Sequence, residues 1–193
     1  MANDPTVTVT IPTRIDKACS RTNSRYAIAG PQIRKAKSGA TVATATDGHI
    51  LAAVECEGEA PPEPAIIPAS LLAKRKGGTR LTLNGRASNG QQESGYIDGN
   101  FPPAIDVVPG KWQPDALVLS LNRKLLNHLA DAIGAGDKIV LVQDRKGSAI
   151  RVMGLADEGG PQTSGIGVIM PVNLDDKADY PAAWDAARER LLK

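Results

Sequence analysis

The sequence predicts an α+β protein assembled from three similar βαβββ units. The main observation is a recurring junction at which an apolar strand runs into the start of a helix. These junctions lie at Pro12, Pro68 and Asn122, so they are 56 and 54 residues apart. Proline suits the first turn of a helix and asparagine suits an N-cap. Strand-like runs with tight-turn pairs follow each junction, and such a fixed period indicates one supersecondary unit used repeatedly.

The first two units are expected over residues 5–60 and 64–110, and together they make one domain, 1–114. In the first unit a strand precedes a helix that runs from Thr13 to about Ser24. The strands expected in this unit are Val7–Ile11, Tyr26–Gly30, Gln32–Lys37, Thr41–Thr46 and His49–Cys56.

The later strands follow the same order. A third unit, half a domain, is expected over 115–174, with a helix beginning at Asn122. In the second and third units the expected strands are Ala65–Ile67, Thr79–Leu83, Gln91–Ile97, Leu117–Leu121, Lys138–Val142, Ala149–Met153 and Ile166–Met170. Three such units predict sheets that are largely antiparallel, with the helices on one face.

Composition excludes several classes of protein. The chain is 41% apolar and 23% charged, which is typical of a globular protein and not of a disordered one. No apolar run approaches the roughly 20 residues of a membrane span, and Met1–Pro5 is not typical of a signal peptide. Cys19 and Cys56 allow one disulfide at most, so a reducing cytoplasm is expected, with Cys19 as a small buried residue.

No arrangement of residues predicts catalysis. His49 lies beside Asp47, but Asp47-Gly48 is a turn pair, which favours a turn or pocket-lining role for this histidine. His128 lies at the edge of an apolar helical stripe. The cysteines and histidines lack metal-ligand spacing, and no phosphate-binding loop occurs. We therefore expect a protein that is not an enzyme and that holds neither a cofactor nor a metal.

Basic residues concentrate in the predicted helices, although the whole chain carries only +2. In the first helix they share one face at i, i+3 and i+7. The basic residues of the three helices are Arg14, Lys17, Arg21, Lys74, Arg75, Lys76, Arg123 and Lys124. An ordinary solvated surface is one interpretation. Three related helices with the same bias favour the other, a surface that neutralises DNA phosphates without reading bases.

Four segments resemble motifs of the bacterial β sliding clamp, the processivity factor of DNA polymerase III. Thr44–Ala52 (TATDGHILA) is similar to the clamp signature ATDGHRLA, and Gly99–Pro109 to G-R-F-P-D-Y…V-[IL]-P. Arg25–Gly30 is similar to R-Y-x-L-N-G, and Val168–Leu174 to the closing V-V-M-P-M-R-L. The segments keep the family's order over roughly residues 7–174. Clamps have six units in three domains, whereas this chain resembles the middle domain followed by the last half-domain.

The resemblance implies a hydrophobic groove that accepts short linear motifs of polymerases and repair proteins. The matching positions are Ile28, Thr46, Gly48, His49, Leu51, Pro102, Val107, Ser148, Val168, Ile169, Met170, Pro171 and Val172. Small and apolar side chains with a flexible methionine suit a pocket for aliphatic or aromatic anchors. Ile50 and Asn173 stand where arginines are usual, and Asp106 where a basic or polar residue is usual. A less positive rim is therefore expected.

The resemblance also implies a DNA-clamp fold, with antiparallel sheets outside and short basic helices on one face. The implied function is a processivity factor that encircles duplex DNA, independently of sequence, as a homo-oligomeric ring. Twelve units around the duplex would need four chains, hence a homotetramer. The unpaired third unit must then find a mate in another subunit or be covered. The alternative is an interaction module without a ring, which binds or competes for clamp-binding motifs. Size determination separates the two.

The tail, 175–193, continues beyond the last clamp-like segment and is predicted to be helical. Pro181 suits the first helical position, and the alanines after it favour helix. Trp184, Ala187 and Leu191 fall at i, i+3 and i+7 and form one apolar stripe. A helix this short is marginal alone, so it is expected to dock. It covers its own chain, bridges to a neighbouring subunit, or lies over the groove.

Overall fold

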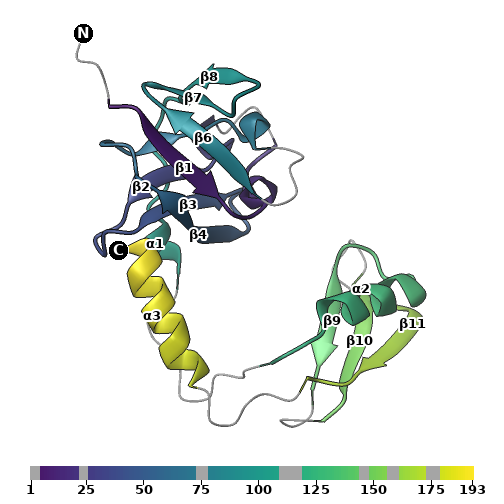
Figure 1. The fold of residues 1–193 in the computed structure, drawn as a ribbon. Coiled ribbons are helices and arrows are strands. Elements are labelled where there is room, and N and C mark those ends of the chain that lie inside the picture. Colours follow the sequence, from purple (N-terminus) through teal and green to yellow (C-terminus); the bar gives the residue numbers. More distant parts are fainter. Residues whose placement is uncertain are drawn as a thin grey trace. The chain divides into compact units, whose positions relative to one another are not determined.

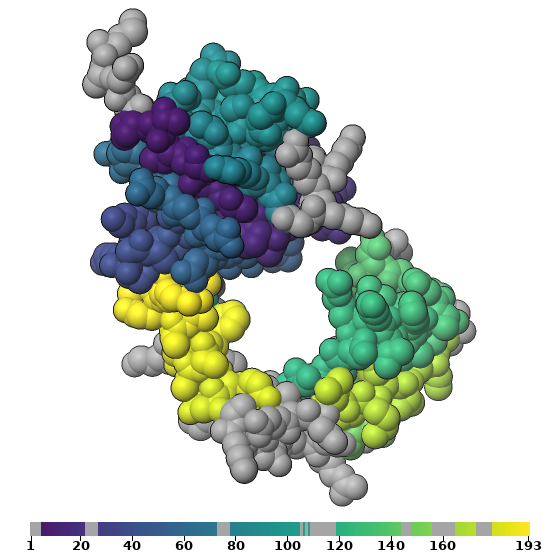
Figure 2. Space-filling model, viewed as in Figure 1, coloured from purple at the N-terminus to yellow at the C-terminus, as the bar shows by residue number. Residues whose placement is uncertain are grey.

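The computed structural model describes residues 5–21, 26–72, 78–108, 119–143, 148–155, 161–172 and 179–193. The chain forms two compact units (Figure 1). Unit 1 comprises Met1–Lys111 together with Tyr180–Lys193, and unit 2 comprises Trp112–Asp179. The C-terminal helix therefore belongs to the same unit as the N-terminal strands. In Figure 2 this helix, in yellow, lies directly against the blue part of unit 1.

Unit 1 is built on an eight-stranded sheet in which hydrogen-bonded neighbours run antiparallel. The strand order is β5-β2-β3-β4-β1-β6-β7-β8. The first strand, β1, pairs with both β4 and β6 and so joins the strands of the two repeats. The strands are β1 Val7–Ile11, β2 Gln32–Lys35, β3 Thr41–Thr46, β4 Leu51–Gly58, β5 Ala65–Ile66, β6 Thr79–Leu83, β7 Arg86–Ser88 and β8 Glu93–Gly95.

Aliphatic residues that alternate along the strands form the core of unit 1. Val7, Val9 and Ile11 of β1 are buried, and Val9 lies opposite the buried Leu81 of β6. Period-two alternation places these side chains on one face of the sheet. Strand β3 differs because all of its residues from Thr41 to Thr46 are buried. Strand β3 is therefore covered on both faces.

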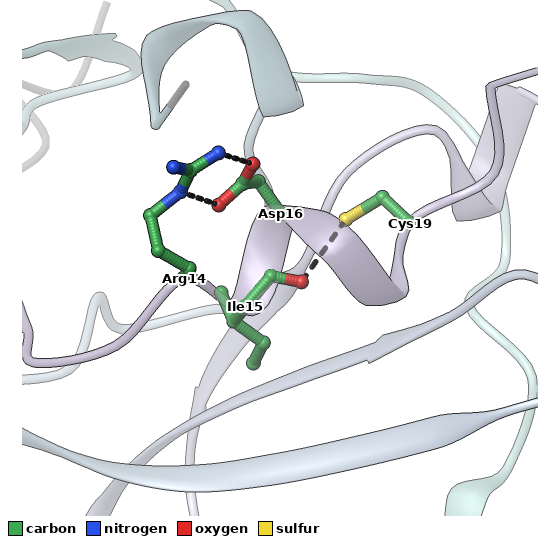
Figure 3. Close-up of polar contacts among 4 residues, drawn as sticks. All are labelled: Arg14, Ile15, Asp16 and Cys19. Carbon is green, nitrogen blue, oxygen red and sulfur yellow. Dashed lines mark hydrogen bonds and ion pairs between the residues drawn. The ribbon is translucent and has the colours of Figure 1, made fainter. Parts of the chain in front are cut away.

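The predicted helix from Thr13 to about Ser24 is wrong. The described part of this segment contains a single 3₁₀ turn, η1, at Ile15–Ala18. Two local features account for its shortness. The guanidinium of Arg14 pairs with both carboxylate oxygens of Asp16, at 2.7 and 2.8 Å, across the start of the turn (Figure 3). Cys19 then adopts an extended conformation, which ends the turn.

The described part of unit 1 contains three other short helical elements. They are η2 at Tyr26–Ile28, η3 at Ala69–Leu71 and α1 at Ala104–Val107. A strand was predicted at the position of η2, and this is wrong. The chain after η2 instead packs tightly on the start of the second repeat. A Cβ on Gly30 would lie only 1.8 Å from the backbone oxygen of Ile67, so glycine is needed for this approach.

Unit 2 contains a three-stranded antiparallel sheet, in the order β11-β10-β9, with helix α2 on one face (Figure 1). Asn122 is the N-cap of α2, as predicted, because its side-chain oxygen accepts hydrogen bonds from the backbone N–H groups of Lys124 and Leu125. The elements are α2 Arg123–Ala132, β9 Ile139–Val142, β10 Ile150–Leu155 and β11 Pro161–Ile169.

The core of unit 2 lies between α2 and the sheet. Ile150, Val152 and Ile169 are buried there, and Leu129 of α2 packs against them. Gly167 of β11 faces the same helix, since a Cβ at this position would lie 2.6 Å from Cδ1 of Leu129. The predicted α+β class with antiparallel sheets is confirmed. No helix in the described parts of the chain is long and apolar enough to cross a membrane.

Candidate functional site

A pocket of about 990 Å³ opens on unit 1 between the sheet and the C-terminal helix, α3 (Tyr180–Leu192). Four segments form it: η2, the β3–β4 turn with the first half of β4, the chain around α1, and α3. The lining residues are Ala27, Ile28, Thr46, Gly48, His49, Ile50, Leu51, Ala52, Ala53, Asn100, Pro102, Ala104, Val108, Trp184, Ala187, Arg188, Leu191 and Leu192. Most of these side chains are aliphatic or small.

The β3–β4 turn forms one rim of the pocket and is held by its own side chains. Asp47 accepts hydrogen bonds from the backbone N–H groups of His49 (2.8 Å) and Ile50 (2.9 Å). The hydroxyl of Thr46 accepts from the N–H of Gly48 at 3.1 Å and donates to the oxygen of Ile50 at 2.6 Å. The hydrogen bonds that the backbone N–H groups of Ile50 and His49 donate to the carboxylate lower the pKa of Asp47. This network fixes the turn and leaves His49 and Ile50 exposed at the rim.

Small residues on β4 and around α1 make room for the pocket. Ala52 and Ala53 of β4 line it next to Leu51, so the strand wall has little side-chain bulk. On the other side the chain approaches through Gly99, which has a φ of 131° and lies against Ala27. This left-handed conformation suits glycine. Pro102 and Ala104, which follow it, line the pocket.

The C-terminal end of α3 is fixed to the sheet by polar contacts. Arg34 of β2 donates hydrogen bonds to the backbone oxygens of Leu191 (3.1 Å) and Leu192 (2.9 Å). The last carbonyls of a helix lack partners within it and lie at the negative end of its dipole, so a guanidinium stabilises them. The Ser38 hydroxyl donates to the oxygen of Arg190 at 2.9 Å, and Arg190 pairs with Glu55 of β4 at 3.2 Å.

Six of the predicted groove residues line this pocket: Ile28, Thr46, Gly48, His49, Leu51 and Pro102. The side chain of Val107 lies outside the described residues, although its backbone is in α1. Ser148 and Pro171 are half-buried in unit 2. The prediction from the clamp-like motifs left out the α3 residues of the lining. The Trp184 stripe is the signal in the sequence that points to them.

The remaining predicted groove residues lie in unit 2, along β11 and just after it. Val168 and Met170 are exposed, with 61% and 65% of their surface accessible, and Val172 is exposed as well. Ile169 is only 5% exposed, because neighbouring residues of a strand point to opposite faces. Its side chain packs in the core beneath α2, and its place in the groove stays a prediction.

The residues predicted to contact DNA differ in exposure and in whether they already pair with an acidic side chain. Arg14 pairs with Asp16, and the hydrogen bond from Arg14 lowers the pKa of that carboxyl group (Figure 3). Lys17 and Arg21 are exposed, but the helical face predicted to align them with Arg14 does not form. In unit 2 the exposed residues of the set are Arg123 and Lys124. Lys74, Arg75 and Lys76 lie outside the described residues.

Both cysteines are free thiols in the interior of unit 1. Burial raises the pKa of Cys19 to about 12 and that of Cys56 to about 11. The Sγ of Cys19 lies 3.8 Å from the backbone oxygen of Ile15 (Figure 3). Protonated, buried thiols are poor nucleophiles. Within the described ranges no group of three or more His, Cys, Asp or Glu side chains is arranged to hold a metal ion.

The likeness to known proteins is one of fold. No protein-family model matches the sequence, and no curated protein matches it significantly. The DNA polymerase III β subunit of Pseudomonas aeruginosa matches over 89% of this chain and 52% of its own, with a TM-score of 0.60 and 19% identity. The C. crescentus β sliding clamp matches over 89% and 52%, with a TM-score of 0.59 and 21% identity.

A third match extends over nearly the whole chain. The DNA polymerase sliding clamp of Bacillus subtilis matches over 99% of this chain and 56% of its own, with a TM-score of 0.62 and 15% identity. The predicted DNA-clamp fold is confirmed. The chain spans about half the length of the clamps it matches.

Proposed function

We propose that this chain is a sliding-clamp-like protein that associates with duplex DNA as a homo-oligomeric ring and tethers partner proteins through the pocket of unit 1. The observation that carries the proposal is the convergence of six clamp-like motif residues on one pocket. These residues come from η2, the β3–β4 turn and the chain before α1. Their meeting in one apolar site is what a peptide-binding groove requires.

The chemistry of the pocket suits a short linear motif with apolar anchors. Leu51 and Ile28 offer aliphatic surface, and the alanines of β4 leave depth for a side chain of the partner. The rim at His49 is fixed by the Asp47 network, so little order has to be imposed when a peptide binds. Small grooves with few anchors bind on the order of micromolar. The partners proposed are DNA polymerases and repair proteins.

The DNA-binding part of the proposal is supported by the exposed cations at the start of α2. Arg123 and Lys124 occupy its first turn, where the helix dipole is already positive and no acidic residue offsets it. Cations at this end do not stabilise the helix, but they add to a positive field that attracts phosphate. Lys17 and Arg21 are exposed as well. Such contacts are independent of base sequence and therefore permit sliding.

Light scattering with and without duplex DNA tests the ring. A ring of four chains of 20.2 kDa has a mass of about 81 kDa, and it should persist when DNA is added. It should also be retained on a closed circular plasmid and lost when that plasmid is cut, because a ring slides off free ends. A monomer or simple dimer in both conditions would leave too few units to surround the duplex.

A second candidate is an interaction module without a ring. The observation that favours it is the Arg14–Asp16 pair, which neutralises one predicted DNA contact and replaces the first basic helix with a short turn. The pocket does not depend on these residues. Peptide binding at the pocket, with no association with circular or linear DNA at low salt, would support this function over the ring.

A further inference from the structure

Helix α3 presents one face to the pocket. Its lining residues are Trp184, Ala187, Arg188, Leu191 and Leu192, which follow the spacing i, i+3, i+4, i+7 and i+8. This spacing marks a single side of an α-helix. The described residues that line the pocket belong to unit 1, so α3 and the strand wall bound one site within one compact unit.

The two ends of α3 differ in a way that suits a binding wall. The C-terminal end is held by Arg34 and Ser38 and buries Leu192. Toward the other end, Trp184 lines the pocket yet keeps 50% of its surface exposed. A tryptophan held on a docked helix loses little conformational freedom on binding. It also offers a large apolar surface, and for these reasons tryptophans are common among the residues that dominate interfaces.

The charge of the lining narrows the kind of partner. Among the described residues that line the pocket, none is acidic, and the ionisable ones are His49 and Arg188. A lysine or arginine anchor would lose water there without gaining a counter-ion, which is costly. Uncharged aromatic or long aliphatic anchors carry no such cost. A pocket of about 990 Å³ accommodates a short segment with more than one such anchor.

We propose that α3 is a wall of the partner-binding pocket and that the indole of Trp184 packs against an uncharged apolar anchor of a bound peptide. The inference rests on the proposed function and adds a specificity-determining residue to it. The clamp-like motifs predict that the segment Val168–Val172 forms one wall of the peptide-binding groove. The geometry of unit 1 assigns a wall to its own C-terminal helix.

The test uses the full-length chain and a synthetic peptide with Gln followed by Leu and Phe anchors. Trp184→Ala should weaken binding at least about tenfold, as loss of a dominant aromatic contact does. Trp184→Phe should restore most of the affinity, and Asp185→Ala, on the exposed side of the same helix, should leave it unchanged. Circular dichroism and hydrogen exchange of residues 180–192 confirm that α3 stays folded in each variant. Replacing Leu and Phe with Lys should abolish binding.

A second readout reports directly on the indole. The chain has two tryptophans, so Trp112→Phe leaves Trp184 as the single tryptophan. Adding the peptide, which lacks tryptophan, should shift the emission of Trp184 to shorter wavelength as its exposed half is covered. Absence of any shift at saturating peptide would overturn the proposal.

The outcomes separate this inference from the function on which it rests. Binding that is equal in wild type and Trp184→Ala overturns the α3 wall and leaves peptide tethering intact. Tighter binding to Trp184→Ala also overturns it, because α3 would then compete with the peptide. No binding to the wild type overturns the proposed function and the wall together.

Discussion

The guanidinium of Arg34 donates a 2.9 Å hydrogen bond to the backbone oxygen of Leu192, joining strand β2 to the last turn of α3 across 158 residues of sequence. The same guanidinium donates a second hydrogen bond to the backbone oxygen of Leu191. The arginine thus serves as a C-terminal cap supplied by the sheet. With Ser38 and the Arg190–Glu55 pair, it holds the C-terminal end of α3 on the sheet.

Removing this cap should loosen α3 without unfolding unit 1. We expect Arg34→Ala to lower the local stability of the helix by about 1–2 kcal/mol, as loss of hydrogen bonds from a charged group does when partly solvated. Hydrogen exchange of residues 180–192 should speed up while exchange in β1 and β6 stays slow. Arg80→Ala, an exposed arginine on β6, is the matched control. Unchanged exchange in the helix would show that the other contacts of its C-terminal end, from Ser38, Glu55 and the buried Leu192, hold it without Arg34.

The rim turn should depend on the charge of Asp47 at acidic pH. Its pKa lies below the ordinary 3.8 because two backbone N–H groups of the folded turn donate hydrogen bonds to the carboxylate. Because the pKa is lower in the folded state, the charged carboxylate stabilises the fold at pH values above its unfolded pKa. This stabilisation is lost as the pH falls through the folded pKa. We expect Asp47→Asn to lower the melting temperature at neutral pH, with the difference shrinking below about pH 4. A difference that is constant down to the lowest accessible pH would contradict this.

Reversing the charges at the start of α2 should weaken DNA binding while preserving the helix. Arg123→Glu with Lys124→Glu should reduce affinity for random-sequence duplex at low salt and lower the salt slope by about 1 per lost phosphate contact. Acidic residues in a first turn favour the helix by about 0.3–1 kcal/mol, so unfolding should not explain the loss. Arg14→Ala should have a smaller effect, since Arg14 pairs with Asp16. If Lys35→Glu, at the exposed end of β2, weakened binding equally, the assignment to α2 would be wrong.

The two thiols should be protected in the native protein. Cys19 and Cys56 are buried, and burial raises their pKa values to about 12 and 11 from an ordinary 9.0. We expect slow reaction with a disulfide reagent near pH 8 and rapid reaction of both after denaturation. Because the pKa of each thiol is raised in the folded state, its contribution to stability is fully present below the unfolded pKa and is lost as the pH rises. The free energy of unfolding should therefore fall above about pH 9. Fast reaction of either thiol in the native state would contradict its burial.

The strand pattern of the fold could be predicted from sequence because its signals are local. Alternation at Val7–Ile11 and Thr79–Leu83 predicts strands that the structure reproduces at the same residues. The cap at Asn122 was likewise predictable, since capping is a local preference. The prediction of the first helix was wrong because of a local side-chain contact that the helical pattern does not reveal. Asp16 lies among the basic residues of this segment, and its carboxylate binds Arg14 across the start of the turn.

The site could be predicted in part. The motif around Asp47 and Gly48 predicts a tight turn, and six motif residues line the pocket. The position of α3 could not be derived, because its anchor is a contact between Arg34 and a helix at the far end of the chain. Periodicity predicts that Trp184 lies on an apolar stripe. It does not say which surface that stripe meets.

The central claim is that the pocket of unit 1 binds peptides, and NMR titration of the labelled full-length chain tests it most directly. With the Gln-Leu-Phe peptide, the amide signals of Thr46–Leu51 and the indole N–H of Trp184 should shift together. They should saturate with one dissociation constant on the order of micromolar. Signals from β7 and β8, whose residues do not line the pocket, should stay in place. Shifts confined to other surfaces, or none at saturating peptide, would contradict the account.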